Sequence, residues 1–298
     1  LGVGNFSEDD IKEASRAFTG WTIAPKIPRN PLGRFYWNFE YKPEDHDDGE
    51  KTFLGHTGNF NGEDIIEILA DQPATPRFLA RHLYNFFVAD EAQVPAWNIT
   101  PPRDPEAIQT LVDAYNDSKG DIRSILRVLF KSDFFKKARF EHVKSPAELV
   151  VGTVRIAGNY NGPRPGLTAL AMECNWQGQE LLNPPSVESW HTGSEWINSG
   201  SLMRRTNFFA DLVGDVERPG IQAIIVNLKA RGDLSPEQLV EGCLDLMGPL
   251  EISDDSRTEL VSHAAEDGPI QWGNNGNSDH RVGEMLQLIV SLRDYQFA

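Results

Sequence analysis

Apolar residues recur at helical spacing along most of the chain. Ser7 precedes three acidic residues, and Ile11, Ala14 and Phe18 then fall three to four positions apart, as on one face of a helix. This pattern predicts a first helix over about 8–19. The same reasoning predicts further helices over 62–71, 75–88, 105–118, 121–131, 145–158, 167–174, 196–213, 219–230, 235–247, 253–266 and 279–295. We therefore expect a mainly α protein, an irregular array of many helices.

The helical pattern is interrupted between residues 22 and 61. Prolines and glycines punctuate this stretch, and residues 34–41 alternate aromatic and polar side chains, which is typical of a short strand. We expect a long ordered loop that contains a small β-hairpin. The stretch 159–166 is also rich in Gly and Pro and is a candidate sub-boundary within a single helical domain over 1–298.

The chain is acidic. Lys and Arg together number 28 against 44 for Asp and Glu, so the formal net charge is -16. Nucleic acid and anionic lipid are poor partners for such a surface, because their phosphates would be repelled. A cationic partner, a metal ion or a neutral polymer fits better, and the alternative is that the acidity only aids solubility. No apolar run reaches the roughly 18 residues of a membrane span.

The chain has two cysteines, Cys174 and Cys243. Two are too few for a disulfide framework, and they lack the paired spacing of a zinc site. Each lies in an apolar, helix-like context, which predicts buried free thiols. One long-range disulfide between them is the alternative.

Five blocks of sequence occur in order across almost the whole chain. They are LGVGN at 1–5 with the acidic helix after it, HDDGEKTFLG at 46–55, FLARHLYNFFV at 78–88, GDIR at 120–123 with KSPAELV at 144–150, and the stretch 183–205 that contains NPP, WIN and LMRR. Together they resemble the large bacterial family known as domain of unknown function 1800.

The resemblance implies an exported bacterial protein, periplasmic or extracellular, often encoded beside a protein with a sulfatase-like fold. Members have a further helical region before the LGVGN block, so we expect this chain to be the C-terminal part of a longer protein, with apolar surface exposed near 1–20. The family has no established catalytic residues to carry over. One departure is at 191–193, where His-Thr-Gly replaces a Pro-Gly-Gly-like turn.

The segment 45–48 places the imidazole of His46 among three carboxylates. Hard divalent cations favour such oxygen-rich clusters with an occasional His. Neighbouring residues in an extended segment point to opposite faces, so we take His46 and Asp47 as the candidates for a metal or acid–base site. The alternative is a solvated acidic turn in which Lys51 pairs locally.

His56 and His82 are the candidates to complete that centre, since distant ligands usually finish a metal site. The four residues define one functional hypothesis, a metal-assisted hydrolase with a divalent cation as cofactor. His82 also lies on a crowded apolar helix face, where the alternative is a hydrogen-bonded core residue.

Charged residues also occur within apolar helices or at their starts. Arg81 and Lys144 are two of them, and unpaired burial of such groups would be costly, which predicts an internal network of ion pairs. The functional alternative is a polar cleft in which both bind an anionic group. His191, with Glu188 or Glu195, is a further candidate base, although no nucleophile motif accompanies it.

Trp190 and Trp196 lie in or beside loops. Aromatic faces on loops stack well on sugar rings, so these two are candidates for carbohydrate binding. The alternative is that they hold a long loop down.

Three functions therefore stay open. The first is a binding or accessory protein for a surface polymer or for a partner such as the sulfatase-like protein. The second is the hydrolase centred on His46 and Asp47, and the third is a structural helical module. The chain has no nucleophile elbow, phosphate-binding Gly loop, dinucleotide fingerprint or His-Glu-x-x-His helix, which favours the first.

Overall fold

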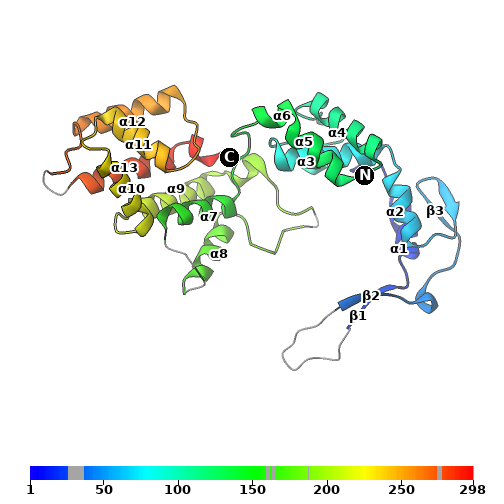
Figure 1. Cartoon of the computed structure of the whole chain (residues 1–298). Helices are drawn as coiled ribbons and strands as arrows, with labels where there is room; N and C mark the ends of the chain where they lie inside the picture. Colours follow the sequence, from blue (N-terminus) through cyan, green and yellow to red (C-terminus); the bar gives the residue numbers. More distant parts are fainter. Residues whose placement is uncertain (26–36, 159–161, 163–164, 187, 274–276, 298) are drawn as a thin grey trace. The chain divides into compact units, whose positions relative to one another are not determined.

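A computed structural model of the chain describes residues 1–25, 37–158, 162, 165–186, 188–273 and 277–297 (Figure 1). The chain forms two compact units. Unit 1 comprises residues 1–87 with 91–137, and unit 2 comprises 88–90 with 138–298. A single helical domain over 1–298, the expectation from the sequence, stays a prediction. The division falls at 137–138, whereas the candidate sub-boundary 159–166 belongs to unit 2, and residues 159–161 and 163–164 of it lie outside the described residues.

The protein is mainly α, as the hydrophobic pattern predicts. The described residues form α1 (Glu8–Ala17), α2 (Gly62–Ala70), α3 (Ala74–Phe87), α4 (Pro105–Ser118), α5 (Ile122–Lys131) and α6 (Asp133–Lys137) in unit 1. In unit 2 they form α7 (Pro146–Ala157), α8 (Leu167–Trp176), α9 (Ser199–Gly214), α10 (Pro219–Ala230), α11 (Pro236–Leu246), α12 (Asp254–Glu266) and α13 (Ser278–Ser291). Only the short α6 lies outside the predicted ranges, because five residues are too few to show a helical period.

Capping side chains explain why several helices begin where they do. At four helix starts the side chain of the cap residue accepts a backbone N–H of the first turn. The side chain of the third helical residue accepts the backbone N–H of the cap in return. The four cap residues are Ser7, Asn61, Ser145 and Ser235. Such reciprocal caps satisfy N–H groups that have no partner within the helix. Because each cap involves only residues within one turn, a short stretch of sequence is enough to predict where the helix begins.

Two small hairpins lie in the predicted long loop. β1 (Trp21–Pro25) pairs antiparallel with β2 (Trp37–Tyr41), which confirms a small hairpin there, although 26–36 lie outside the described residues. β3 (Lys51–Phe53) pairs with β4 (His56–Gly58). The tight turn between β3 and β4 uses Leu54 and Gly55, both with positive φ, which suits the right-handed twist of a hairpin.

Unit 1 has a small core beneath the second hairpin. Ala17 of α1, Phe53 of β3 and Ile65 of α2 are buried together there. α3 packs on α4 and α4 on α5, and their buried side chains include Tyr84 and Leu111. Val3, Phe6 and Ile11 are exposed.

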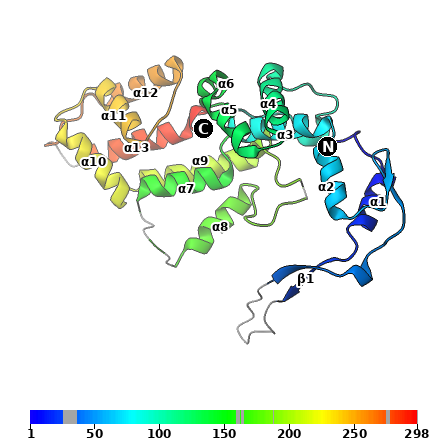
Figure 2. The same cartoon turned by 45° about the vertical axis from the view of Figure 1, so that its right-hand side comes forward.

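Unit 2 has a larger core. α9 and α13 lie side by side, α7 packs on α9, and α11 packs on α12 (Figures 1 and 2). The start of α10 approaches the end of α7 so closely that a Cβ on Gly220 would lie 1.9 Å from the carbonyl oxygen of Ile156. The buried side chains include Leu149, Phe209, Val213, Ile221, Ile225, Leu228, Val240, Leu286, Ile289 and Val290.

Cys174 and Cys243 are both free and buried, as predicted for structural thiols. No helix in the described part of the chain has the length and apolar character needed to cross a bilayer.

Candidate functional site

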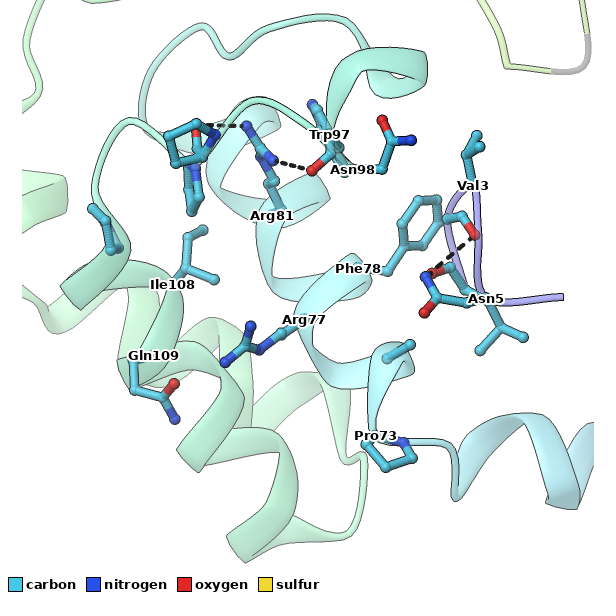
Figure 3. Close-up of a pocket in the computed structure, with 16 residues that line it drawn as sticks. Val3, Asn5, Pro73, Arg77, Phe78, Arg81, Trp97, Asn98, Ile108 and Gln109 are labelled. Atoms are coloured by element: carbon cyan, nitrogen blue, oxygen red, sulfur yellow. Dashed lines mark hydrogen bonds between the residues drawn. The ribbon is translucent and has the colours of Figure 1, made fainter.

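A cleft of about 770 Å³ opens in unit 1 between residues 1–5, the first half of α3 and the segment 97–109 (Figure 3). Its lining is largely apolar and contains no carboxylate. Gly2 has positive φ, and a Cβ there would lie 3.1 Å from the ring of Phe78, so glycine lets the first segment lie close to α3. The lining residues are Leu1, Gly2, Val3, Asn5, Pro73, Ala74, Arg77, Phe78, Arg81, Trp97, Asn98, Pro101, Pro102, Pro105, Ile108 and Gln109.

Arg81 holds one wall of the cleft in place. Its Nε and Nη2 donate to Oε2 of Glu91 at 3.0 and 2.7 Å. Nη1 donates to the carbonyl oxygens of Trp97 and Thr100, at 3.3 and 2.9 Å, and Nη2 also donates to that of Pro101 at 3.1 Å. A guanidinium has five N–H donors, and all five are occupied here. Arg81 therefore positions the loop and has no donor left for a ligand.

Three aromatic rings form a fixed wall beside Arg81. Phe78 meets His82 edge to face with ring centroids 4.5 Å apart, and His82 lies 4.6 Å from Trp97. The Trp97 ring lies 4.7 Å from the Arg81 guanidinium carbon, and its Nε1 donates to the carbonyl of Ala92 at 2.6 Å. Burial lowers the pKa of His82, so its ring is neutral at pH 7.

Polar side chains at the edge of the cleft are available for recognition. Arg77 and Asn98 are exposed and make no hydrogen bond or ion pair with any other described side chain or backbone group. Gln109 donates from Nε2 to Asp113 at 2.8 Å, which leaves its amide oxygen. Figure 3 shows Arg77 pointing to the side of Gln109 and Phe78 pointing toward the segment of Val3. The cleft thus combines aromatic surface with one unpaired cation and two amides.

His46 and Asp47 are engaged with α1 and the residues that follow it. Nδ1 of His46 lies 2.9 Å from the carbonyl oxygen of Thr19, so this nitrogen carries the hydrogen and donates it. Oδ2 of Asp47 accepts from Nε of Arg16 at 2.8 Å, and Oδ1 accepts from the backbone N–H of Gly49 at 2.8 Å. The Arg16 guanidinium lowers the pKa of Asp47 to about 2. These bonds tie the loop to α1.

The loop around 45–48 is not simply a solvated acidic turn. Lys51 is almost fully buried beneath it, and its Nζ donates to the backbone carbonyls of Asp47 and Gly49, the latter at 2.9 Å. Lys51 therefore pairs locally, as predicted, but with backbone carbonyl oxygens and not with the carboxylates of the loop.

The four predicted metal ligands do not form one centre. His56 is exposed on β4, and His82 packs against Phe78 and Trp97, two rings that line the cleft. In the part of the chain that the structure describes, no three His, Cys, Asp or Glu side chains come together in a way that could hold a metal ion.

Lys144 lies in unit 2, whereas Arg81 lies in unit 1. Its Nζ donates to the carbonyl oxygen of Tyr295 at 3.0 Å and lies 4.7 Å from the centre of that ring. Burial lowers the pKa of Lys144 to about 8.

The loop before α9 carries the remaining candidates. Trp196 is buried, and its carbonyl accepts from the Ser201 hydroxyl at 2.8 Å, while Trp190 is half-buried. His191 is exposed, and its Nδ1 lies 2.5 Å from Oε2 of Glu195. Because Trp196 is buried, its ring packs inside the unit and holds the loop down. The ring is therefore not accessible for stacking on a sugar.

Comparison with known proteins identifies the family. The sequence model of the family described as Protein of unknown function (DUF1800) matches residues 1–297. The chain belongs to this family. Searches of curated proteins and of solved structures found no match. The resemblance seen in the five sequence blocks is thus confirmed, and the function of this DUF1800 protein has to be argued from its geometry.

The cleft of this DUF1800 protein could hardly be predicted from its sequence. Trp97 lies in the proline-rich link between α3 and α4, and an aromatic ring flanked by prolines is the one local signal that could have marked it. Phe78 and His82 share their helical spacing with ordinary core residues. Neither Arg77 nor Asn98 is marked by its neighbours as a cleft residue, so only the fold brings them to one cleft.

Proposed function

We propose that this DUF1800 protein is a binding protein and that the cleft of unit 1 takes a segment of a polysaccharide. The observation that carries the proposal is the fixed aromatic wall of Phe78 and Trp97 beside unpaired polar side chains. Apolar faces of sugar rings stack on aromatic rings, and sugar hydroxyls pair with amide and guanidinium groups. A cleft of about 770 Å³ is within the usual size of a small-ligand site.

The charges at the cleft favour an acidic polysaccharide. The lining has no carboxylate, and Arg81 is neutralised by Glu91, which leaves Arg77 as the unpaired cationic side chain of the described lining. The formal net charge of -16 means that most of the surface repels anions. A sugar unit with a carboxylate or sulfate group is expected to place that group at Arg77. Export from the bacterial cell, which the family resemblance suggests, belongs to this proposal, since such polymers occur at cell surfaces.

Calorimetric titration with uronic-acid oligosaccharides and with neutral glucan oligosaccharides of equal length tests the proposal. We expect the acidic series to bind more tightly. Arg77→Gln should weaken its binding by about tenfold, since a charge-assisted hydrogen bond contributes roughly 1.5–3 kcal/mol. Asn98→Ala should weaken both series.

Arg127→Gln is the matched control, because Arg127 is an exposed arginine of α5 in the same unit and does not line the cleft. This variant should bind like the unchanged protein. Absence of binding to either series, or equal affinities of the two arginine variants, would refute carbohydrate binding in the cleft.

A further inference from the structure

Arg205 of α9 is buried, as Arg81 is, but its surroundings differ from those of Arg81. Its exposed fraction is 0%, yet only two of its N–H donors have an acceptor among the residues that the structure describes. Nη1 donates to the carbonyl oxygen of Trp196 at 3.4 Å, and Nη2 donates to that of Lys144 at 2.5 Å. Nε has no partner, and within the described residues no carboxylate forms an ion pair with this guanidinium.

A second cation lies at the same place. The Lys144 carbonyl accepts from Arg205, and the Lys144 ammonium uses one of its three N–H groups on the carbonyl of Tyr295 at 3.0 Å. Burial lowers the pKa of both groups, and the positive charge of Arg205 adds to the shift at Lys144. Glu148 is the carboxylate whose charge opposes the shift at both groups, and its Oε2 also accepts from the backbone N–H of Ser145 at 2.7 Å as part of the helix cap.

Gln296 adds a third buried polar group. Its exposed fraction is 2%, and neither its side-chain oxygen nor its side-chain nitrogen has a partner in the described structure. The backbone carbonyl of Gln296 accepts from the N–H of Lys144 at 2.8 Å, so the two residues are neighbours. Arg205, Lys144 and Gln296 are thus neighbours in unit 2, and each has side-chain hydrogen-bonding groups that are not used within the described structure.

Burying a cation without an opposing charge is costly, and proteins pair such groups. Arg81 shows the usual arrangement in this chain, with one carboxylate and all five donors used. Glu148 supplies one negative charge against the two positive charges of Arg205 and Lys144, and water could accept hydrogen bonds there but could not supply a second negative charge. Guanidinium and ammonium groups only donate, so the group that completes the site must be an acceptor with negative charge.

We propose that Arg205, Lys144 and Gln296 form a binding site for a small oxyanion, a carboxylate, phosphate or sulfate group. The two cations supply charge and fixed donors, and the amide of Gln296 supplies a further donor. This site shares no residue with the cleft of unit 1, because Arg205, Lys144 and Gln296 all belong to unit 2. The proposal therefore stands or falls independently of carbohydrate binding.

The test uses the full chain in a zwitterionic buffer at pH 7, with sulfate, inorganic phosphate or acetate added at constant ionic strength. We expect at least one of the three to raise Tm in a saturable way, and calorimetry to give one binding site per chain. Comparison of the three identifies the type of oxyanion. Lys144→Met should weaken the binding by about tenfold or more, because it removes a charge-assisted contact.

Arg155→Met is the matched control, since Arg155 is an exposed residue of α7 and its loss changes the net charge equally. This variant should keep the affinity. Arg205→Met is expected to remain folded without added anion, because an apolar side chain replaces an unpaired buried charge, and to lose the saturable rise in Tm. A rise that does not saturate, or that is the same in Lys144→Met and Arg155→Met, would be a general salt effect and would overturn the proposal.

Discussion

Arg81 and Glu91 form a buried ion pair in which Nη2 lies 2.7 Å from Oε2 and the side chains are 7% and 1% exposed. The other oxygen of Glu91 accepts the backbone N–H of Arg103 at 2.8 Å. The pair thus connects α3 to both ends of the segment that carries Trp97. The shape of the cleft depends on these two residues, although neither has a free group for a ligand.

Breaking this pair should destabilise unit 1. Arg81→Met leaves the carboxylate of Glu91 buried without its partner, which typically costs about 3–5 kcal/mol. We expect urea unfolding, followed by circular dichroism, to show a loss of this size. The double variant Arg81→Met with Glu91→Leu should lose less than the sum of the two single variants, because it leaves no unpaired charge. Single-variant losses below about 1 kcal/mol would contradict this role.

Asp47 should make stability depend on pH in the acid range. Its pKa is lowered to about 2 by Arg16, from about 3.9 in an unfolded chain. The native state favours the charged form, so the stabilisation is complete above about pH 4 and is lost as the pH falls toward 2. Asp47→Asn should flatten the dependence of Tm on pH in this window. Asp9→Asn, at an exposed position of α1, serves as the control and should change it little.

His46 is expected to act through its hydrogen bond to the Thr19 carbonyl. His46→Ala should lower the free energy of unfolding by roughly 1 kcal/mol, the usual contribution of one hydrogen bond. Metal analysis of protein purified without chelator should give the same content for this variant and for the unchanged protein. Loss of one equivalent of bound metal on substitution would instead support the hydrolase hypothesis.

Lys144 should make stability rise in the alkaline range when no anion is bound. Its pKa is lowered to about 8, below the roughly 10.4 of an unfolded chain, so between these values the unfolded state binds more protons. Stability is then lowest below about pH 8 and increases toward pH 10. The charged groups that act on Lys144 are Glu148 and Arg205, and the Tyr295 ring faces it.

Two comparisons check this assignment. Lys144→Met should lack the rise in Tm between pH 8 and 10, while Arg155→Met should keep it. A saturating oxyanion should suppress the rise in the unchanged protein, because it favours the protonated ammonium. A fall in Tm over this range that is the same in all three proteins would argue against a titrating Lys144.

The two thiols should be unreactive in the folded protein. Burial raises the pKa of Cys243 to about 12 and also raises that of Cys174, so little thiolate is present at pH 8. We expect a thiol-reactive dye to detect no thiol in the native chain and two after unfolding in guanidinium without reductant. Detection of none after unfolding would indicate the alternative disulfide.

Local features of the sequence were sufficient to predict the helices. Ser145 followed by Pro146 and Glu148 predicts the start of α7 because a cap involves only residues within one turn. The small hairpin was predictable for the same reason. The hairpin of β3 and β4 was not distinguished from the surrounding loop, since three-residue strands are too short to show alternation.

The candidate site could be predicted only in part. Arg81 and Lys144 were expected to be buried charges, and Arg81 is buried while Lys144 is half-buried, but the sequence offered no means of assigning their partners. One expectation joined both in a single network or cleft; Arg81 belongs to unit 1 and Lys144 to unit 2, and that expectation stays a prediction. Arg205 is fully buried and was not a candidate, because an arginine within a helix has no local mark of burial.

The sequence by itself determined the helical class, the starts of the helices and the family, because periodicity, caps and ordered blocks of residues are properties of neighbouring positions. Only the tertiary structure decided that Arg81 meets Glu91, that Trp97 reaches Phe78 and His82, and that Arg205 is fully buried. These pairings follow from how helices far apart in the chain pack. Packing sets burial and distance, and those two quantities decide whether a charge is paired or left for a ligand.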